Sequence, residues 1–91
     1  MKDIPMPDRH QAVINGIACH TDCHVVAALD ALGLILGTEQ FRATGDGHRL
    51  THTWLASFGP IAAVAVKSTG SFGAAMTRSL AQRGCRVIEI N

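Results

Sequence analysis

The sequence of 91 residues has little charge: 16% of its residues are Asp, Glu, Lys or Arg, and the formal net charge is +1. Its basic residues are spread from Lys2 to Arg86 and form no basic stripe. Such a stripe is what draws a protein non-specifically onto phosphate backbones. The composition by itself therefore does not predict strong nucleic-acid binding.

The sequence also lacks the marks of export and of membrane insertion. The number of cysteines is odd, at three, and the first ten residues, MKDIPMPDRH, contain neither an apolar run nor a small-residue cleavage site. A disulfide framework is therefore not expected. Gly and Pro interrupt the apolar stretches before they reach about 20 residues, the length that a bilayer requires. We expect a cytoplasmic protein without a membrane segment.

Apolar residues are plentiful, at 47% of the chain. This supports one modest core, since a chain of this size buries roughly 60 to 65% of its unfolded surface. The first ten residues hold two prolines and four charged residues. They predict a flexible leader over 1–10, followed by a single domain over 11–91.

The first half of this domain predicts three strands. Residues 11–19 and 24–31 are rich in Val, Ile and Ala and are separated by the polar HTD, which is typical of a β-hairpin. Gly33 can adopt a positive φ and leads into a third, weakly alternating strand over 35–44. Consecutive strands joined by short turns should be antiparallel.

The pattern then changes to that of a helix over 45–59, with Asp46 as its cap. Its apolar stripe follows the spacing i, i+3, i+4, i+7 at Thr51, Trp54, Leu55 and Phe58, so Trp54 is expected in the core. Residues 61–67, IAAVAVK, are almost wholly apolar, which predicts a central strand covered on both faces.

A Gly-rich turn over 69–73 introduces a second helix, which ends at Gly84. The predicted inward stripe of this helix is Phe72, Ala75, Met76, Ser79 and Leu80. Residues 85–91 form a last strand, parallel to the strand before it. The chain is thus predicted to be α/β: a three-stranded antiparallel meander and then α-β-α-β, giving a mixed five-stranded sheet with helices packed on it.

This order of elements is that of the ribonuclease H-like fold, and two motifs point to a family. One is Gly-hydrophobic-x-x-His-x-Asp-x-His, at Gly16, Ile17, His20, Asp22 and His24, and the other is Thr-Gly-Ser-aromatic-Gly, from Thr69 to Gly73. With these motifs, the sequence from Ile14 to Asn91 resembles the N-terminal RuvC-like domain of insertion-sequence-110 family transposases.

The resemblance implies a protein of DNA transposition and DNA recombination, encoded by a mobile element. In that family a magnesium-dependent, nuclease-like domain with four acidic residues works with a serine-bearing C-terminal domain, and its partners are DNA and a structured RNA. The first two acidic positions correspond to Ala18 and Lys67 here. The other two, and the C-terminal helix of the full domain, would lie beyond Asn91. The resemblance therefore implies a fragment whose catalytic acids are replaced.

Replacing the two acids by Ala18 and Lys67 removes the ligands that a magnesium ion would need. Magnesium needs hard oxygen ligands, usually carboxylates, and two-metal phosphoryl chemistry needs carboxylates that bridge both ions. A methyl group and an ammonium group supply none. Lys67 would also repel a cation by about 4 kcal/mol per unit charge at about 4 Å with an effective dielectric of about 20. We predict a pseudoenzyme that holds no metal or other cofactor.

The stretch CHTDCH over 19–24 raises the question of another metal. Zinc bound by Cys19, His20, Cys23 and His24 is disfavoured, because neighbouring strand residues point to opposite faces. Covalent haem is disfavoured because the attachment pattern is one residue too long and normally requires export. We favour a hairpin turn containing His20, Asp22 and His24, with the cysteines as small apolar fillers.

Two further groups are candidates. His48 and His52, at i and i+4, could hold a metal on one helical face, but with no third ligand evident we favour a solvated face. The KSTGSFG turn could contact a phosphate or nucleic acid through Lys67, Thr69 and Ser71, and a plain tight turn is an equal alternative.

The sequence leaves a second class of function open. Without the C-terminal helix of the full domain, the fold would expose an apolar edge. The chain could then be a non-enzymatic module that binds a protein or RNA there, pairs with intact transposase subunits, or associates with itself.

Overall fold

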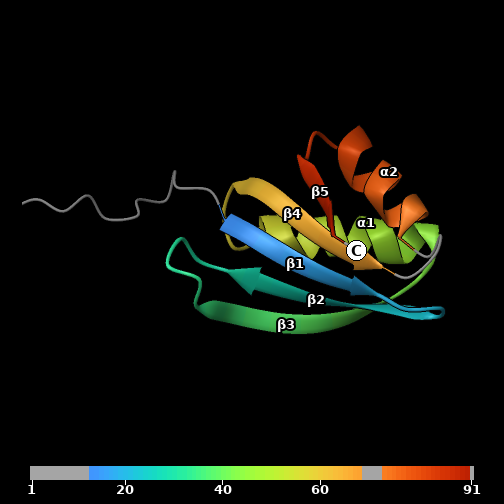
Figure 1. Cartoon of the computed structure of the whole chain (residues 1–91), viewed down its shortest axis with the longest axis horizontal. Helices are drawn as coiled ribbons and strands as arrows, with labels where there is room; N and C mark the ends of the chain where they lie inside the picture. Colours follow the sequence, from blue (N-terminus) through green and yellow to red (C-terminus); the bar gives the residue numbers. More distant parts are fainter. Residues whose placement is uncertain (1–12, 69–72, 91) are drawn as a thin grey trace, which may run out of the picture.

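The computed structural model describes residues 13–68 and 73–90. Its elements are β1 (Val13–Cys19), β2 (Cys23–Leu29), β3 (Ile35–Arg42), α1 (Gly45–Ala56), β4 (Ile61–Ser68), α2 (Ala74–Gln82) and β5 (Val87–Ile90), as Figure 1 shows. Neither helix in these ranges is long and apolar enough to cross a membrane. The predicted order β-β-β-α-β-α-β is confirmed. The predicted leader over 1–10 lies outside the described residues.

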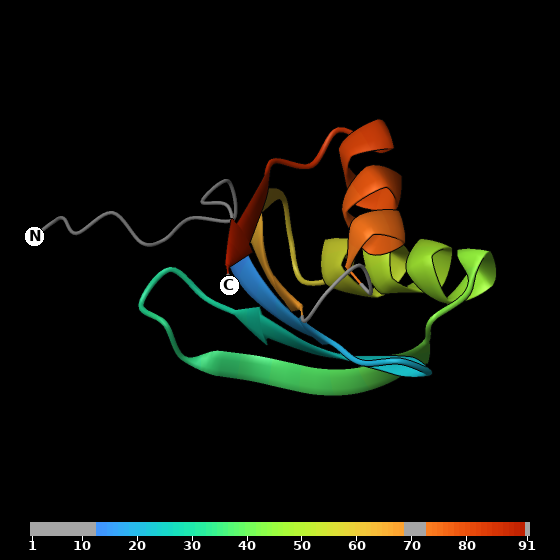
Figure 2. The ribbon, with the colours of Figure 1, turned by 45° about the vertical axis from the view of Figure 1, so that its right-hand side comes forward.

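The five strands form one mixed sheet in the order β3-β2-β1-β4-β5. β1 is central and pairs antiparallel with β2 and parallel with β4, while β3 and β5 are the edges. Both helices cover the same face of this sheet (Figure 2). The predicted α/β class, with an antiparallel meander followed by parallel strands, is confirmed.

The hairpin turns follow from local hydrogen bonding. In the first, the backbone N–H of His20 donates to the carbonyl of Cys23 at 3.0 Å. In the second, the Asp30 carboxylate accepts from the N–H groups of Leu32 and Leu34 at 2.8 and 2.9 Å. Gly33 has the predicted positive φ, 86°. These turns fix the register of the meander.

The core lies between the sheet and the two helices. Its buried apolar members are Ile17, Cys19, Val26, Ala28, Leu55, Val64, Val66, Met76 and Leu80. Trp54 packs edge-on against Phe41 and Phe58, with ring centroids 5.9 and 4.8 Å apart, and borders this cluster. The predicted inward stripe is confirmed for Thr51 and Leu55, which are buried, whereas Trp54 and Phe58 are partly buried and pack against the core from its border.

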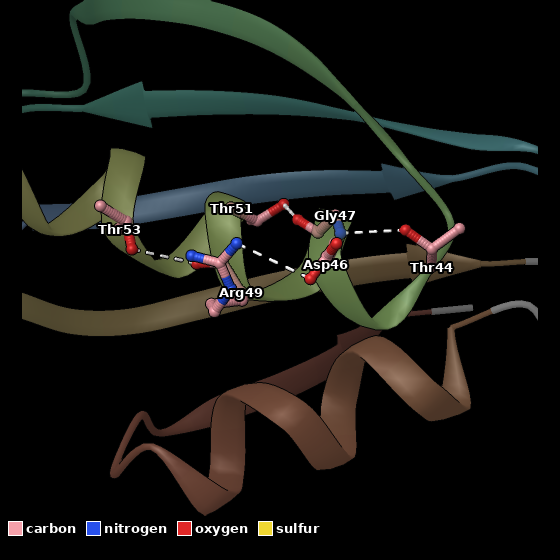
Figure 3. A network of polar contacts seen from close by, with 6 residues as sticks. All are labelled: Thr44, Asp46, Gly47, Arg49, Thr51 and Thr53. Atoms are coloured by element: carbon pink, nitrogen blue, oxygen red, sulfur yellow. Dashed lines mark hydrogen bonds and ion pairs between the residues drawn. The ribbon is translucent and has the colours of Figure 1, made fainter.

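The N-terminus of α1 is capped differently from the prediction. The helix begins at Gly45, and the N-cap is Thr44, which has extended backbone and whose hydroxyl accepts from the N–H of Gly47 at 3.0 Å (Figure 3). Asp46 is already inside the first turn, where its carboxylate lies 3.7 Å from Arg49. The prediction of Asp46 as the cap was wrong because a capping side chain must precede the helical backbone.

Gly47 lets α1 approach the end of β3 closely. A Cβ atom at this position would overlap the carbonyl oxygen of Arg42, whereas a Cβ at Gly45 would meet nothing within 4 Å. The connection is also tied to the first hairpin, because the N–H of Ala43 donates to the carbonyl of Asp22 at 2.9 Å. The position of α1 over the sheet therefore depends on the absence of a Cβ atom at Gly47.

Two further predictions need correction. β4 is not covered on both faces by the described residues: Val64 and Val66 are buried under the helices, but Lys67 is exposed. The reason is that α1 and α2 lie on one side of the sheet. In α2, Met76 and Leu80 point inward as predicted, but Ala75 is exposed, because this short helix buries only a narrow stripe.

Candidate functional site

The two positions that the family resemblance assigns to metal-binding acids are neighbours in the sheet. Ala18 in β1 and Lys67 in β4 are register partners in a parallel pair. Their chain neighbours Ile17 and Val66 are buried under the helices. Since side chains alternate along a strand, Ala18 and Lys67 belong to the opposite face, where Ala18 is partly buried and Lys67 is exposed.

The Lys67 ammonium group can attract an anion at this point, and neither it nor the Ala18 methyl group supplies a ligand for a divalent cation. Within residues 13–68 and 73–90, no group of three or more His, Cys, Asp or Glu side chains is placed to hold a metal ion. Thr69 and Ser71, the other two predicted phosphate contacts, lie outside the described residues. Of the three predicted phosphate contacts, Lys67 is therefore the one that lies within the described residues.

The CHTDCH stretch does not form a cluster around one point. Cys19 is 5% exposed and belongs to the core, which confirms its assignment as an apolar filler. His20 and Asp22 are exposed in the turn, as predicted. Cys23 is half-buried and its sulfur accepts from the Gln40 side chain at 2.8 Å. The alternation that argued against zinc is present in the structure.

His24 and His48, in contrast, form a buried pair that the sequence analysis missed. His24 lies in β2 and is 0% exposed, so it is not a turn residue, and His48 lies in the first turn of α1 and is 7% exposed. Their Nε2 atoms are 3.3 Å apart and the rings stack with centroids at 5.4 Å. The prediction of a solvated helix face was wrong for His48. His52, one turn later, is partly exposed.

The environment of the pair favours the neutral form of both rings. Burial lowers the pKa of His24 below the ordinary 6.5, and the nearby His48 and His20 rings lower it further. Burial likewise lowers the pKa of His48. One ring must donate its Nε2 proton to the other, and the Nδ1 atom of His24 is buried without a hydrogen-bond partner among the described residues.

The signal for this pair was present in the sequence. His24, Val26 and Ala28 are every second residue of β2 and therefore share one face of the strand. His48 precedes Leu55 by seven residues, which puts both on the apolar stripe of α1. The prediction counted histidine as polar and so left His24 and His48 out of these apolar stripes. A neutral imidazole can be buried when a second ring pairs with it.

The face of the sheet opposite the helices carries exposed apolar residues beside the exposed Lys67. Ile14, Val25, Ile88 and Ile90 are between 41% and 52% exposed there, and we call this surface the open sheet face. Register places small residues between them, at Gly16, Ala18, Ala27 and Ala65. A second exposed apolar group, Leu32, Leu34, Ile35 and Leu36, occupies the connection between β2 and β3 and the start of β3.

Comparisons with known proteins support the fold. No protein-family profile matches the sequence, and no curated protein sequence matches it. Among solved structures, the chain is similar to Pelota from Archaeoglobus fulgidus, with a TM-score of 0.64 and 15% sequence identity. The match covers 92% of this chain and 27% of the Pelota chain. At this identity the similarity shows a shared mixed α/β fold, and the chain spans about a quarter of that protein's length.

Proposed function

We propose that this chain is a non-catalytic relative of the N-terminal domain of insertion-sequence-110 family transposases, and that it acts by binding. The observation that carries the proposal is the pairing of Ala18 with Lys67. The two positions are far apart in the sequence, and both were assigned to metal-binding acids by motif alone. Two acids that bind the same metal ions must lie close together, and the adjacency of these two positions agrees with that requirement.

The chemistry of these two side chains defines what the domain does. Without carboxylates it does not assemble the two-metal site of phosphoryl transfer. The Lys67 ammonium offers a contact to a phosphate of DNA or of a structured RNA. Thr69 and Ser71 stay predicted contacts, because they lie outside the described residues. We place the protein in the cytoplasm, where its thiols stay reduced, with DNA transposition and intact transposase subunits as its context.

Restoring the acids tests the relationship to the family. We expect the variant Ala18→Asp/Lys67→Glu to bind Mn²⁺, measured by the loss of the free-ion signal in electron paramagnetic resonance. The wild type should bind none at this position. The matched control is Ala18→Asn/Lys67→Gln, which has similar volume but no carboxylates and should behave as the wild type. Equal Mn²⁺ binding by all three proteins, or metal-dependent DNA cleavage by the wild type, would refute the proposal.

Nucleic-acid binding is tested separately by fluorescence anisotropy with a labelled DNA duplex and a labelled RNA hairpin. We expect weak, salt-dependent binding that Lys67→Gln reduces, because a phosphate contact releases counterions. Arg78→Gln is the control, since Arg78 is exposed on α2, on the other side of the sheet. Absence of binding to both probes at low salt would reject this part of the proposal.

A second candidate function is protein association through the open sheet face, and its exposed isoleucines favour it. An apolar face of this kind is typical of an interaction site. We expect sedimentation equilibrium to show self-association that Val25→Lys weakens. Leu50→Lys is the control, because Leu50 is similarly exposed, at 45% against 41% for Val25, but lies on α1. A monomer at high protein concentration would exclude self-association through this face.

A further inference from the structure

The contact between α1 and β2 contains two imidazoles that face each other. The Nε2 atoms of His24 and His48 are 3.3 Å apart, and both rings are almost fully buried. Each Nε2 can take part in this contact as a donor or as an acceptor, so a neutral pair is self-consistent. A pair in which both rings are protonated is unfavourable, because two N–H donors and two positive charges would then face each other.

The groups around the pair offer no compensation for a positive charge. Opposite His24 stand Cys19 on β1, a thiol whose pKa burial raises, and Phe41 on β3. The loop before β2 adds His20, itself a source of positive charge. The carboxylates of these elements are solvent-exposed, at Asp22, Glu39 and Asp46, and Asp46 is paired with Arg49. Among the described residues, neither imidazole has a carboxylate partner.

The unpartnered Nδ1 atom of His24 is the second, independent observation. This atom is buried and accepts no hydrogen bond from the described residues. In an imidazolium both ring nitrogens carry protons. Whichever tautomer the neutral ring has, protonated His24 carries a buried Nδ1–H group without an acceptor among the described residues, together with a buried charge, and both are costly.

We propose that the His24–His48 pair is a pH-sensitive latch, which holds the first turn of α1 against β2 while both rings are neutral and releases it in mildly acidic solution. The latch joins the start of β2 to the helix terminus that Gly47 brings close to β3. Protons would enter once the turn opens, since each opened imidazole then recovers its ordinary affinity for a proton.

The direction of the effect follows from linkage. Both histidines have a lowered pKa in the folded chain, so the latched state is fully favoured above about pH 6.5 and is lost progressively as the pH falls below that value. Two protons taken up on opening would raise the opening constant by up to about 100-fold per pH unit, and one proton by up to about 10-fold.

Native-state hydrogen exchange of the full chain tests the latch. The N–H groups of Gly47 and His48, which donate to Thr44, should lose at least about 10-fold in protection between pH 7 and pH 5.5, after correction for intrinsic exchange. Amides of β4 should lose less. The variant His48→Gln should halve the pH dependence, and the control His52→Gln, on the same helix, should leave it unchanged.

Three outcomes would overturn the proposal. The first is an NMR titration of the wild type in which His24 and His48 protonate at their ordinary pKa with the fold unchanged, a measurement that remains decisive if His48→Gln does not fold. The second is stabilisation by Zn²⁺ at pH 7.5 that His48→Gln abolishes, since the pair would then be a metal site. Equal pH dependence in the wild type and His48→Gln would also refute it.

Discussion

Replacing Gly47 by alanine should destabilise the protein, although alanine is the better helix former. In an exposed helix interior this change would stabilise by about 1 kcal/mol. Here the new methyl group would overlap the carbonyl oxygen of Arg42 and lie 2.8 Å from its carbonyl carbon. Both are backbone atoms, which cannot rotate away as a flexible side chain could. The helix must therefore move away from β3.

The expected loss can be bounded from two opposing terms. Inserting a methyl group into a closely packed site costs about 1 to 3 kcal/mol, occasionally more, and the helix preference returns at most about 1 kcal/mol. Because the obstacle is backbone, we expect a net loss of about 2 kcal/mol. Any shift of α1 would also separate His48 from His24, which adds to the loss.

Urea unfolding at pH 7.5, followed by the fluorescence of the single Trp54, measures the change. Gly45→Ala in the same helix is the matched control, since its methyl group meets nothing within 4 Å, and it should be neutral or stabilising by up to about 1 kcal/mol. In thermal unfolding, 1 kcal/mol corresponds to roughly 4 to 8 °C in a domain of this size. If Gly47→Ala is as stable as Gly45→Ala, the close approach of α1 to β3 does not exist.

Three other measurements test separate parts of the structure. Thr44→Ala should lose about 1 kcal/mol of stability and Thr44→Ser should stay close to the wild type, because the hydroxyl group caps the helix. Equal losses of stability in the two variants would contradict this capping role. Leu55→Ala should cost about 2 to 5 kcal/mol in the same urea assay and Leu50→Ala less than about 0.5 kcal/mol, since Leu55 is fully buried and Leu50 is 45% exposed. Between pH 7.5 and 5.5, neutral burial of His24 and His48 should remove up to about 3 kcal/mol of unfolding free energy, and a flat profile would contradict their lowered pKa values.

The order and type of the elements could be predicted from the sequence because they depend on local patterns. Strand and helix periods, the polar turn at HTD, and the glycines at 33 and 84 act within a few residues of chain. The predicted boundaries agree with the structure to within a few residues over the described ranges. The cap of α1 was missed because Thr44 and Asp46 are both good capping residues, and only the start of the helical backbone distinguishes them.

The tertiary structure alone decided which distant residues meet. The pairing of Ala18 with Lys67 depends on the register of two parallel strands, and that of His24 with His48 depends on how α1 docks on β2. A shift of one residue in register would move every side chain of a strand to the other face, so sequence spacing cannot specify such contacts. The amino-acid sequence alone established which residues can be buried. The packing of the helices and strands determined which of these residues contact one another.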